Sequence, residues 1–379
     1  MLTELTFRRA HLAQAYCDSL QGKGIANATS GLFLAGPRRV GKSTFLINDL
    51  IPEAKTRGWQ VIYVDLWGDK QADPFLLITE AIKSSMTQQK GKLAKLAQKV
   101  QAKMVILKTL ELDFSKPGLP ENTTLVDLLN DLAQLSTKPI LLMIDEAQHA
   151  VMTQNGLNAM FALKSARDQM NIPLKTPRLM LVLTGSNRDK LAQLVIKKDQ
   201  PFFGSEITAF PLLGEDYIDF FTTKVNQSLA ANNQFTQEAI WEAFQLIGYR
   251  PEILRQIIGR VAINHDASAL SDLLKHDTFI WRSQIWEEFA NSFYQLPPLH
   301  QAILRALIEK GVMWSPFSEE AMRYYKQVLK ESNLAISSVQ TAIQSLREQG
   351  FIWQSSRGTY ALEDESFVEW FKHIKNSTG

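Results

Sequence analysis

Short apolar runs alternate with longer helical patterns over the first half of the chain. Five of these runs are rich in Val, Ile, Leu and Phe, which is typical of strands covered on both faces of a sheet. They are residues 32–35, 60–65, 140–145, 179–184 and 206–210. This alternation predicts an α/β fold in which a parallel sheet is flanked by helices.

The strand pattern stops after residue 213 and helical patterns take over. Thr236 stands where it would cap a helix, and Pro251 stands where it would open the next one. These signals predict a helical lid over residues 214–292.

The end of the chain has the pattern of a winged helix. Three helices are expected at residues 299–310, 318–330 and 337–349, and two short strands around a turn and a last helix at 365–375 follow them. Before the first strand, a short helix at 7–20 is expected. The predicted division is therefore an N-terminal helical entry segment (1–30), a P-loop core (31–213), the helical lid (214–292) and a winged-helix domain (293–379).

Composition narrows the class of protein. The chain has 379 residues, 45% hydrophobic content and a formal net charge of +2, which fits several globular domains and excludes a binder that depends on overall positive charge. Cys17 is the only cysteine, so an internal disulfide is excluded and a reducing, cytoplasmic location is expected. The apolar runs are too short to cross a bilayer, so no transmembrane segment is predicted.

A phosphate-binding loop follows the first predicted strand, because residues 36–43 fit the pattern G-x-x-x-x-G-K-[ST]. Glycines let backbone N–H groups turn tightly around phosphate oxygens, the lysine adds a cation, and the serine hydroxyl can ligate Mg²⁺. The predicted ATP-binding residues are Gly36, Pro37, Arg38, Arg39, Val40, Gly41, Lys42, Ser43 and Thr44.

Two adjacent acids end the third predicted strand. Asp145 is expected to hold Mg²⁺ together with Ser43, and Glu146 is expected to orient and polarise the attacking water. A strand ending in Asp-Glu is a weak signal alone but a strong one after a phosphate loop. Gln148 and His149 follow, and packing is the favoured interpretation of His149.

Two further positions are candidates for sensing the γ-phosphate. Asn187, with Ser186 beside it and Thr184 as second choice, follows the fourth strand, whose end should lie beside the phosphate loop. Arg250 stands at a predicted helix start in the lid, where it could report whether the γ-phosphate is present. A strand-to-loop turn and a surface salt bridge, respectively, remain the structural alternatives.

Lysines gather on one face of a helical segment between the second and third strands. Lys92, Lys95, Lys99 and Lys103 have helical spacing. A solvated surface is the favoured interpretation, and contact with a phosphate backbone or an acidic partner is the alternative.

In its order of motifs the chain resembles the archaeal-type ATPase family, a STAND-related branch of the AAA+ P-loop ATPases. The matching stretches are the phosphate loop, residues 145–148 (DEAQ), residues 184–186 (TGS), residues 248–251 (GYRP) and residues 360–364 (YALED) of the winged helix. The resemblance implies binding of ATP and Mg²⁺, slow hydrolysis, and action as a switch or motor on DNA or protein. Where many members carry Gly-Arg, this chain has Phe203-Gly204-Ser205, so Arg188 and Arg167 are the substitutes for an arginine acting across a homo-oligomer boundary.

Two functions follow from the sequence. One is an ATPase acting as a nucleotide-driven switch or motor on duplex DNA or a protein, through the winged helix and the 92–103 lysine face. The other is a signalling or defence switch whose winged helix docks protein.

Overall fold

A computed structural model describes ten stretches of the chain, in two compact units. The stretches are residues 6–23, 27–69, 71–100, 117–119, 123–172, 176–231, 233–263, 270–311, 314–356 and 358–377, without the side chains of 92–100 and 376–377. The core unit comprises the described parts of residues 8–36 and 42–210, and the carboxyl-terminal unit those of 1–7, 37–41 and 211–379. The four-part division drawn from the sequence stays a prediction.

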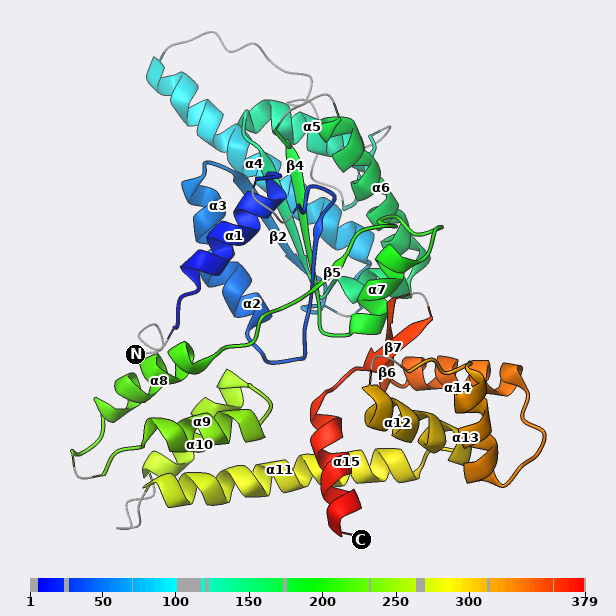
Figure 1. Cartoon of the computed structure of the whole chain (residues 1–379). Coiled ribbons are helices and arrows are strands. Elements are labelled where there is room, and N and C mark those ends of the chain that lie inside the picture. The colour runs from blue at the N-terminus through cyan, green and yellow to red at the C-terminus, as the bar shows by residue number, and fades with distance from the viewer. Residues whose placement is uncertain are drawn as a thin grey trace. The chain divides into compact units, whose positions relative to one another are not determined.

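A five-stranded parallel sheet forms the centre of the core unit (Figure 1). Its strand order is β2-β3-β4-β1-β5. The strands are β1 (Leu32–Ala35), β2 (Gln60–Asp65), β3 (Ile140–Asp145), β4 (Leu179–Gly185) and β5 (Ile207–Ala209). The predicted fold class is confirmed, although β5 is shorter than expected because it is an edge strand paired only with β1 and is followed closely by Pro211.

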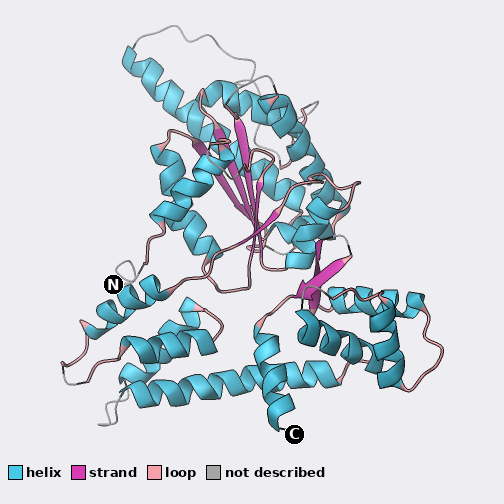
Figure 2. Ribbon diagram, in the orientation of Figure 1, coloured by secondary structure: helices cyan, strands magenta, loops and turns pink. Residues whose placement is uncertain are grey.

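Helices lie on both sides of this sheet (Figure 2). They are α1 (Ala10–Leu20), α2 (Lys42–Phe45), the π-helical η2 (Leu46–Leu50), α3 (Ile51–Thr56), α4 (Pro74–Val100), α5 (Leu125–Ser136), the 3₁₀ segment η4 (Ala147–Met152), α6 (Gln154–Asn171) and α7 (Arg188–Ile196). The first helix begins later than predicted because Arg8 Nε and Arg9 N both donate to Asp49 Oδ1, which holds the preceding residues outside the helix.

The core packs on alternate residues of the strands. Ile140, Leu142 and Ile144 of β3 belong to one buried cluster with side chains of α4, α5, α6 and α7. Leu141 and Met143, which point to the opposite face, are also fully buried. Because both faces of β3 are covered, its sequence is continuously apolar until Asp145.

The described part of the carboxyl-terminal unit is helical apart from a two-stranded hairpin. Its elements are α8 (Glu215–Asn226), α9 (Gln237–Leu246), α10 (Pro251–Ile263), α11 (Leu270–Tyr294), α12 (Pro298–Lys310), α13 (Glu319–Leu329), α14 (Ile336–Glu348), β6 (Ile352–Ser356), β7 (Thr359–Leu362) and α15 (Ser366–Ser377). The predicted cap of α9 is confirmed, since Thr236 Oγ1 accepts a hydrogen bond from Ala239 N at 3.2 Å.

One long helix, α11, contributes to two hydrophobic clusters. Its first half places Leu270 and Leu274 among the buried side chains of α8, α9 and α10. Its second half places Phe293, with Phe289 beside it, among those of α12 to α15. A helix shared in this way links the lid-like helices to the winged-helix domain by packed side chains.

Gly156, in the first turn of α6, lies against the segment that follows the two acids. A Cβ atom built on Gly156 would lie 2.3 Å from Ala150 O and 2.8 Å from Ala150 Cα, which are backbone atoms of η4. Only glycine therefore lets α6 pass this close to the 3₁₀ segment.

We expect Gly156→Ala to lower the free energy of unfolding by about 1–3 kcal/mol or more, because backbone has to shift to relieve the overlap. Gly91→Ala in α4 is the matched control, since a Cβ there meets nothing within 4 Å. Thermal unfolding followed by circular dichroism measures both. Equal stability of Gly156→Ala and the parent protein would show that α6 does not pass close to the backbone of Ala150.

Candidate functional site

The phosphate loop begins directly where β1 ends. β1 pairs in parallel with β4, so Ala35 lies opposite Gly185, and Gly36 N donates to Gly185 O at 3.2 Å. Arg39 (φ 66°) and Gly41 (φ 93°) both adopt the left-handed backbone region. Such a turn points consecutive N–H groups inward, as a loop that wraps an anion requires.

Lys42 is buried although it carries a charge. Its side chain is 5% exposed, and Nζ donates to Gly36 O at 2.7 Å, across the base of the loop. The ammonium group is thus held against the first residue of the loop. Ser43 and Thr44 follow in the first turn of α2 and are exposed.

Asp145 lies at the carboxyl end of β3 and is 1% exposed. Its Oδ1 accepts hydrogen bonds from Thr184 Oγ1 and, at 3.1 Å, from Glu146 N. Its Oδ2 accepts from Tyr63 Oη at 2.9 Å. These donors satisfy a buried carboxylate that would otherwise be costly to desolvate, and they fix its orientation.

Tyr63 is a site residue that the sequence did not reveal. It stands on β2, next to β3 in the sheet, where Tyr63 pairs in register with Met143. Burial, and then the neighbouring Asp145 carboxylate, hold the pKa of Tyr63 above its ordinary value, so the phenol remains a hydrogen-bond donor. The only signal was a tyrosine hydroxyl among the aliphatic residues in the middle of β2, and the strand order was needed to interpret it.

Glu146 has a left-handed backbone, with φ 55° and ψ 41°. Its Oε2 accepts a hydrogen bond from Ser186 Oγ at 2.6 Å and another from Gln148 Nε2. Ser186 follows β4, so the two acids and the end of β4 form one hydrogen-bonded group. Thr184 and Ser186, both candidates from the sequence, are parts of it.

Asn187 caps α7. Its Oδ1 accepts from Lys190 N at 2.8 Å, so the amide oxygen holds the start of this helix. Its expected role toward the γ-phosphate stays a prediction. His149 packs beside Trp67, with ring centroids 4.8 Å apart, as the packing interpretation expected.

The donor set fits Mg²⁺. The Ser43 hydroxyl and the Asp145 carboxylate supply oxygen, the ligand type that Mg²⁺ prefers, and Mg²⁺ in phosphate sites takes few protein ligands and completes its shell with water and phosphate oxygens. In the described stretches, no three or more His, Cys, Asp or Glu residues gather as a metal cluster. Ser43 and Asp145 stay the predicted ligands of Mg²⁺ in the presence of a bound nucleotide.

Arg250 immediately precedes α10 in the carboxyl-terminal unit. Its Nη2 lies 3.4 Å from Asp364 Oδ2, and its guanidinium lies 5.6 Å from the centre of the Trp281 ring. Asp364 follows β7 of the winged helix, and its Oδ1 accepts from Ser366 N at the start of α15. Arg250 thus forms an ion pair with the segment that joins β7 of the winged helix to α15.

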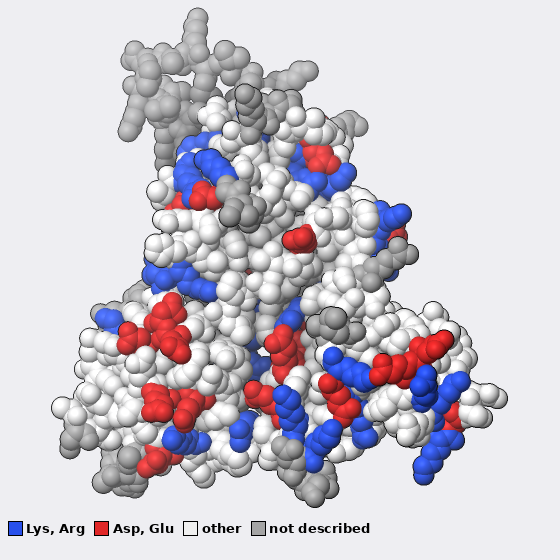
Figure 3. Space-filling model, viewed as in Figure 1, with Lys and Arg blue, Asp and Glu red and all other residues white. Residues whose placement is uncertain are grey.

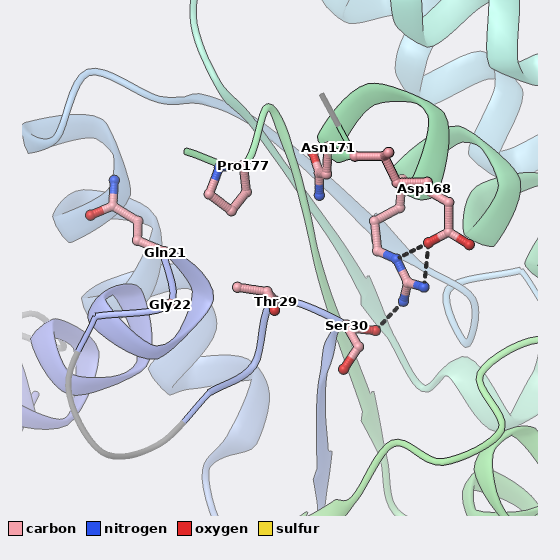
Figure 4. A pocket seen from close by; sticks show the side chains of 9 residues that line it. Gln21, Gly22, Thr29, Ser30, Asp168, Asn171 and Pro177 are labelled. Atoms are coloured by element: carbon pink, nitrogen blue, oxygen red, sulfur yellow. Dashed lines mark hydrogen bonds and ion pairs between the residues drawn. The ribbon is translucent and has the colours of Figure 1, made fainter. Parts of the chain in front are cut away.

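Arg167 lies at the amino edge of the sheet, away from the phosphate loop. Its Nε and Nη2 donate to Asp168 Oδ1 at 3.0 and 2.6 Å, and its Nη1 donates to Ser30 O, just before β1. These residues help to line a polar cavity of about 410 Å³ (Figure 4). Asn171, which also lines this cavity, donates a hydrogen bond to the carbonyl oxygen of Leu179, the first residue of β4. Arg167 therefore makes structural contacts at the amino edge of the sheet, which is opposite the candidate site.

The side chains of the predicted lysine face lie outside the part of the chain that the structure describes. Lys92, Lys95 and Lys99 belong to α4, but their side chains are not described, and Lys103 lies outside the described residues.

Comparison with known proteins supports the fold. Residues 287–373 match the family described as "Probable winged helix domain". The chain is similar to the structure of a Walker-type ATPase of Pyrococcus abyssi, with a TM-score of 0.55 and 20% identity over 97% of this chain and 96% of that one. It is also similar to the ADP form of the Aeropyrum pernix ORC2 protein, with a TM-score of 0.54 and 15% identity over 97% and 93% of the two chains. At these identities the likeness shows the fold alone, and it agrees with the predicted fold class.

No curated protein sequence matches this chain. In the part of the chain that the structure describes, no helix has the length and apolar character needed to span a membrane.

Proposed function

We propose that this chain binds ATP with Mg²⁺ at residues 36–44, hydrolyses it slowly, and uses the nucleotide state to control its winged helix. The observation that carries this proposal is the placement of Lys42 just after β1, and of Asp145 and Glu146 at the end of β3, at the carboxyl edge of one parallel sheet in which β4 lies between these two strands. Phosphate recognition and water activation need these groups at the same edge of the sheet. The likeness to a Walker-type ATPase supports the same activity.

Each residue has a separate task in this proposal. Backbone N–H groups of the loop and the Lys42 ammonium bind the β- and γ-phosphates, and Ser43 and Asp145 hold Mg²⁺, which when bound neutralises charge on the phosphates. Glu146 accepts a hydrogen bond from water and orients it toward the γ-phosphorus. Asn187 and Arg250 sense whether the γ-phosphate is present.

We expect Glu146→Gln to bind ATP like the parent protein but to lower kcat by about 10²- to 10⁴-fold, because an amide cannot accept a proton from water. Lys42→Ala should instead weaken ATP binding by about 10- to 100-fold, since a charge-assisted contact is lost. Phosphate release and equilibrium titration with a fluorescent ATP analogue measure the two effects. Turnover by Glu146→Gln at the parent rate would contradict the role of Glu146.

The pair formed by Arg250 and Asp364 offers a route from nucleotide to winged helix. In this proposal Arg250 exchanges Asp364 for the γ-phosphate in the ATP state, so ATP and the winged-helix domain compete for one guanidinium. Their side chains are 18% and 37% exposed, so the pair is partly screened and weak. A weak competitor suits a switch, because a single phosphate contact can displace it.

We expect Asp364→Asn to raise the ratio of ATP to ADP affinity by up to about fivefold, the equivalent of about 1 kcal/mol for a partly exposed ion pair. Arg250→Ala should lower this ratio, because the group that distinguishes the nucleotides is gone. Arg260→Ala is the matched control, since Arg260 also belongs to α10 and pairs with Asp277 of α11 at 3.7 Å. Unchanged ratios in both test variants would leave Arg250 with a structural role only.

The partner of the winged helix is duplex DNA or a protein, and the surface of α14 favours protein. Its outward side chains include Ser338, Gln340, Thr341 and Gln344, which are exposed and neutral. Arg347 is the one cation of this face, and Arg357 of the wing lies outside the described residues. On the side drawn in Figure 3, basic and acidic side chains are interspersed. Tight DNA binding usually needs several phosphate contacts by cations.

We expect a fragment that begins within α11 and ends at residue 379 to bind duplex DNA weakly at physiological salt. Beginning there keeps Phe289 and Phe293 in the core of the winged helix. Fluorescence anisotropy over a series of salt concentrations measures the affinity and its salt slope, with the full chain as comparison. Tight, sequence-selective binding by the fragment would favour the ATPase that acts on DNA.

A further inference from the structure

Gln148 lies behind Glu146 in a position that the proposed chemistry has not yet used. It belongs to η4, two residues after Glu146, and is 2% exposed. Its Nε2 donates to Glu146 Oε2 and lies 3.3 Å from Ser186 Oγ. The amide is therefore inside the hydrogen-bonded group that joins Glu146 to the end of β4.

Both donors of this group reach the same carboxylate oxygen. Ser186 Oγ donates to Glu146 Oε2 at 2.6 Å, and Gln148 donates to that oxygen from η4. Two donors from different elements restrict the side chain more than one would. Glu146 Oε1 has no part in this clamp, which leaves it as the oxygen to meet a water.

The other end of the Gln148 amide has an unusual environment. Among the described residues, Gln148 Oε1 is buried without a hydrogen-bond partner. Burying an unpaired acceptor costs free energy, and an apolar side chain of similar length would fill the space without that cost. Packing alone therefore does not explain a glutamine at this position.

Gly185 makes room for this amide. A Cβ on Gly185 would lie 2.8 Å from Gln148 Oε1 and 3.2 Å from Leu191 Cδ2. Gly185 is the last residue of β4 and does not have a left-handed backbone. The site therefore requires glycine here because it has no side chain, and not because of its backbone freedom. Gly185 and Gln148 are thus complementary in shape, because the missing side chain of one leaves room for the amide of the other.

We propose that Gln148 is a positioning residue for water activation, acting with Ser186 to hold the Glu146 carboxylate. This inference rests on the proposed ATPase function. Because Gln148 acts through Glu146 and not on the phosphate loop, its loss lowers kcat and leaves nucleotide affinity unchanged. Gly185 is part of the same arrangement, because a methyl group at this position would displace the Gln148 amide.

The test is Gln148→Met, which keeps the length of the side chain and removes its donor. We expect kcat to fall by about 10-fold or more, since small misplacements of a reacting group are costly, with KM and ATP affinity within about twofold. Gly185→Ala, an independent change, should lower kcat in the same selective way. Gln154→Ala is the control, because Gln154 is an exposed glutamine whose amide donates to Asn158 Oδ1.

The outcomes separate this inference from the function on which it rests. A parent protein that turns over ATP, together with a Gln148→Met variant of unchanged kcat, would overturn the role of Gln148 and leave the ATPase intact. A parent protein that neither binds nor hydrolyses ATP would overturn both. A Gln148→Met variant that loses ATP affinity and kcat together would point to a structural role and would also contradict the proposal.

Discussion

The parallel pairing of β1, β4 and β3 is the constraint on which the candidate site depends. Parallel strands bring their carboxyl ends to one edge, so the phosphate loop after Ala35, the acids after Ile144 and the polar residues after Leu183 become neighbours. These segments are far apart in sequence. Apolar side chains buried on both faces hold the strands in this register, and a shift of one residue would turn every side chain to the other face.

The polar groups at this edge form two sets around the two acids. Tyr63 and Thr184 hold Asp145, whereas Ser186 and Gln148 hold Glu146. In the proposed function, metal binding and water activation are thereby supported by different side chains. Because each carboxylate has its own donors, a change in one set can be distinguished experimentally from a change in the other.

Much of this architecture could be predicted from the sequence. The starts of β1, β2, β3 and β4 and the ends of the first three agree with the apolar runs, since strands buried on both faces leave a simple pattern. The phosphate loop and the two acids could be identified because their chemistry restricts residue types at fixed spacing. The winged helix could be identified from helical periodicity and a turn between two short strands.

The contacts that complete the site could not be predicted in the same way. Tyr63 reaches Asp145 only because β2 lies beside β3, and Arg250 meets Asp364 only because α11 contributes to both hydrophobic clusters of its unit. Arg167 was a candidate by residue type alone, and its contacts with Asp168 and Ser30 give it a structural place. Such pairings depend on strand order and packing, which local sequence patterns do not contain.

A crystal structure of the full chain with Mg²⁺ and a non-hydrolysable ATP analogue tests the central claim most directly. The account predicts phosphates surrounded by the backbone N–H groups of residues 36–43, with Lys42 Nζ moved from Gly36 O to a phosphate oxygen. It also predicts Mg²⁺ beside Ser43 and Asp145. Nucleotide bound at the Arg167 cavity, or a loop that excludes phosphate while Lys42 stays on Gly36, would contradict it.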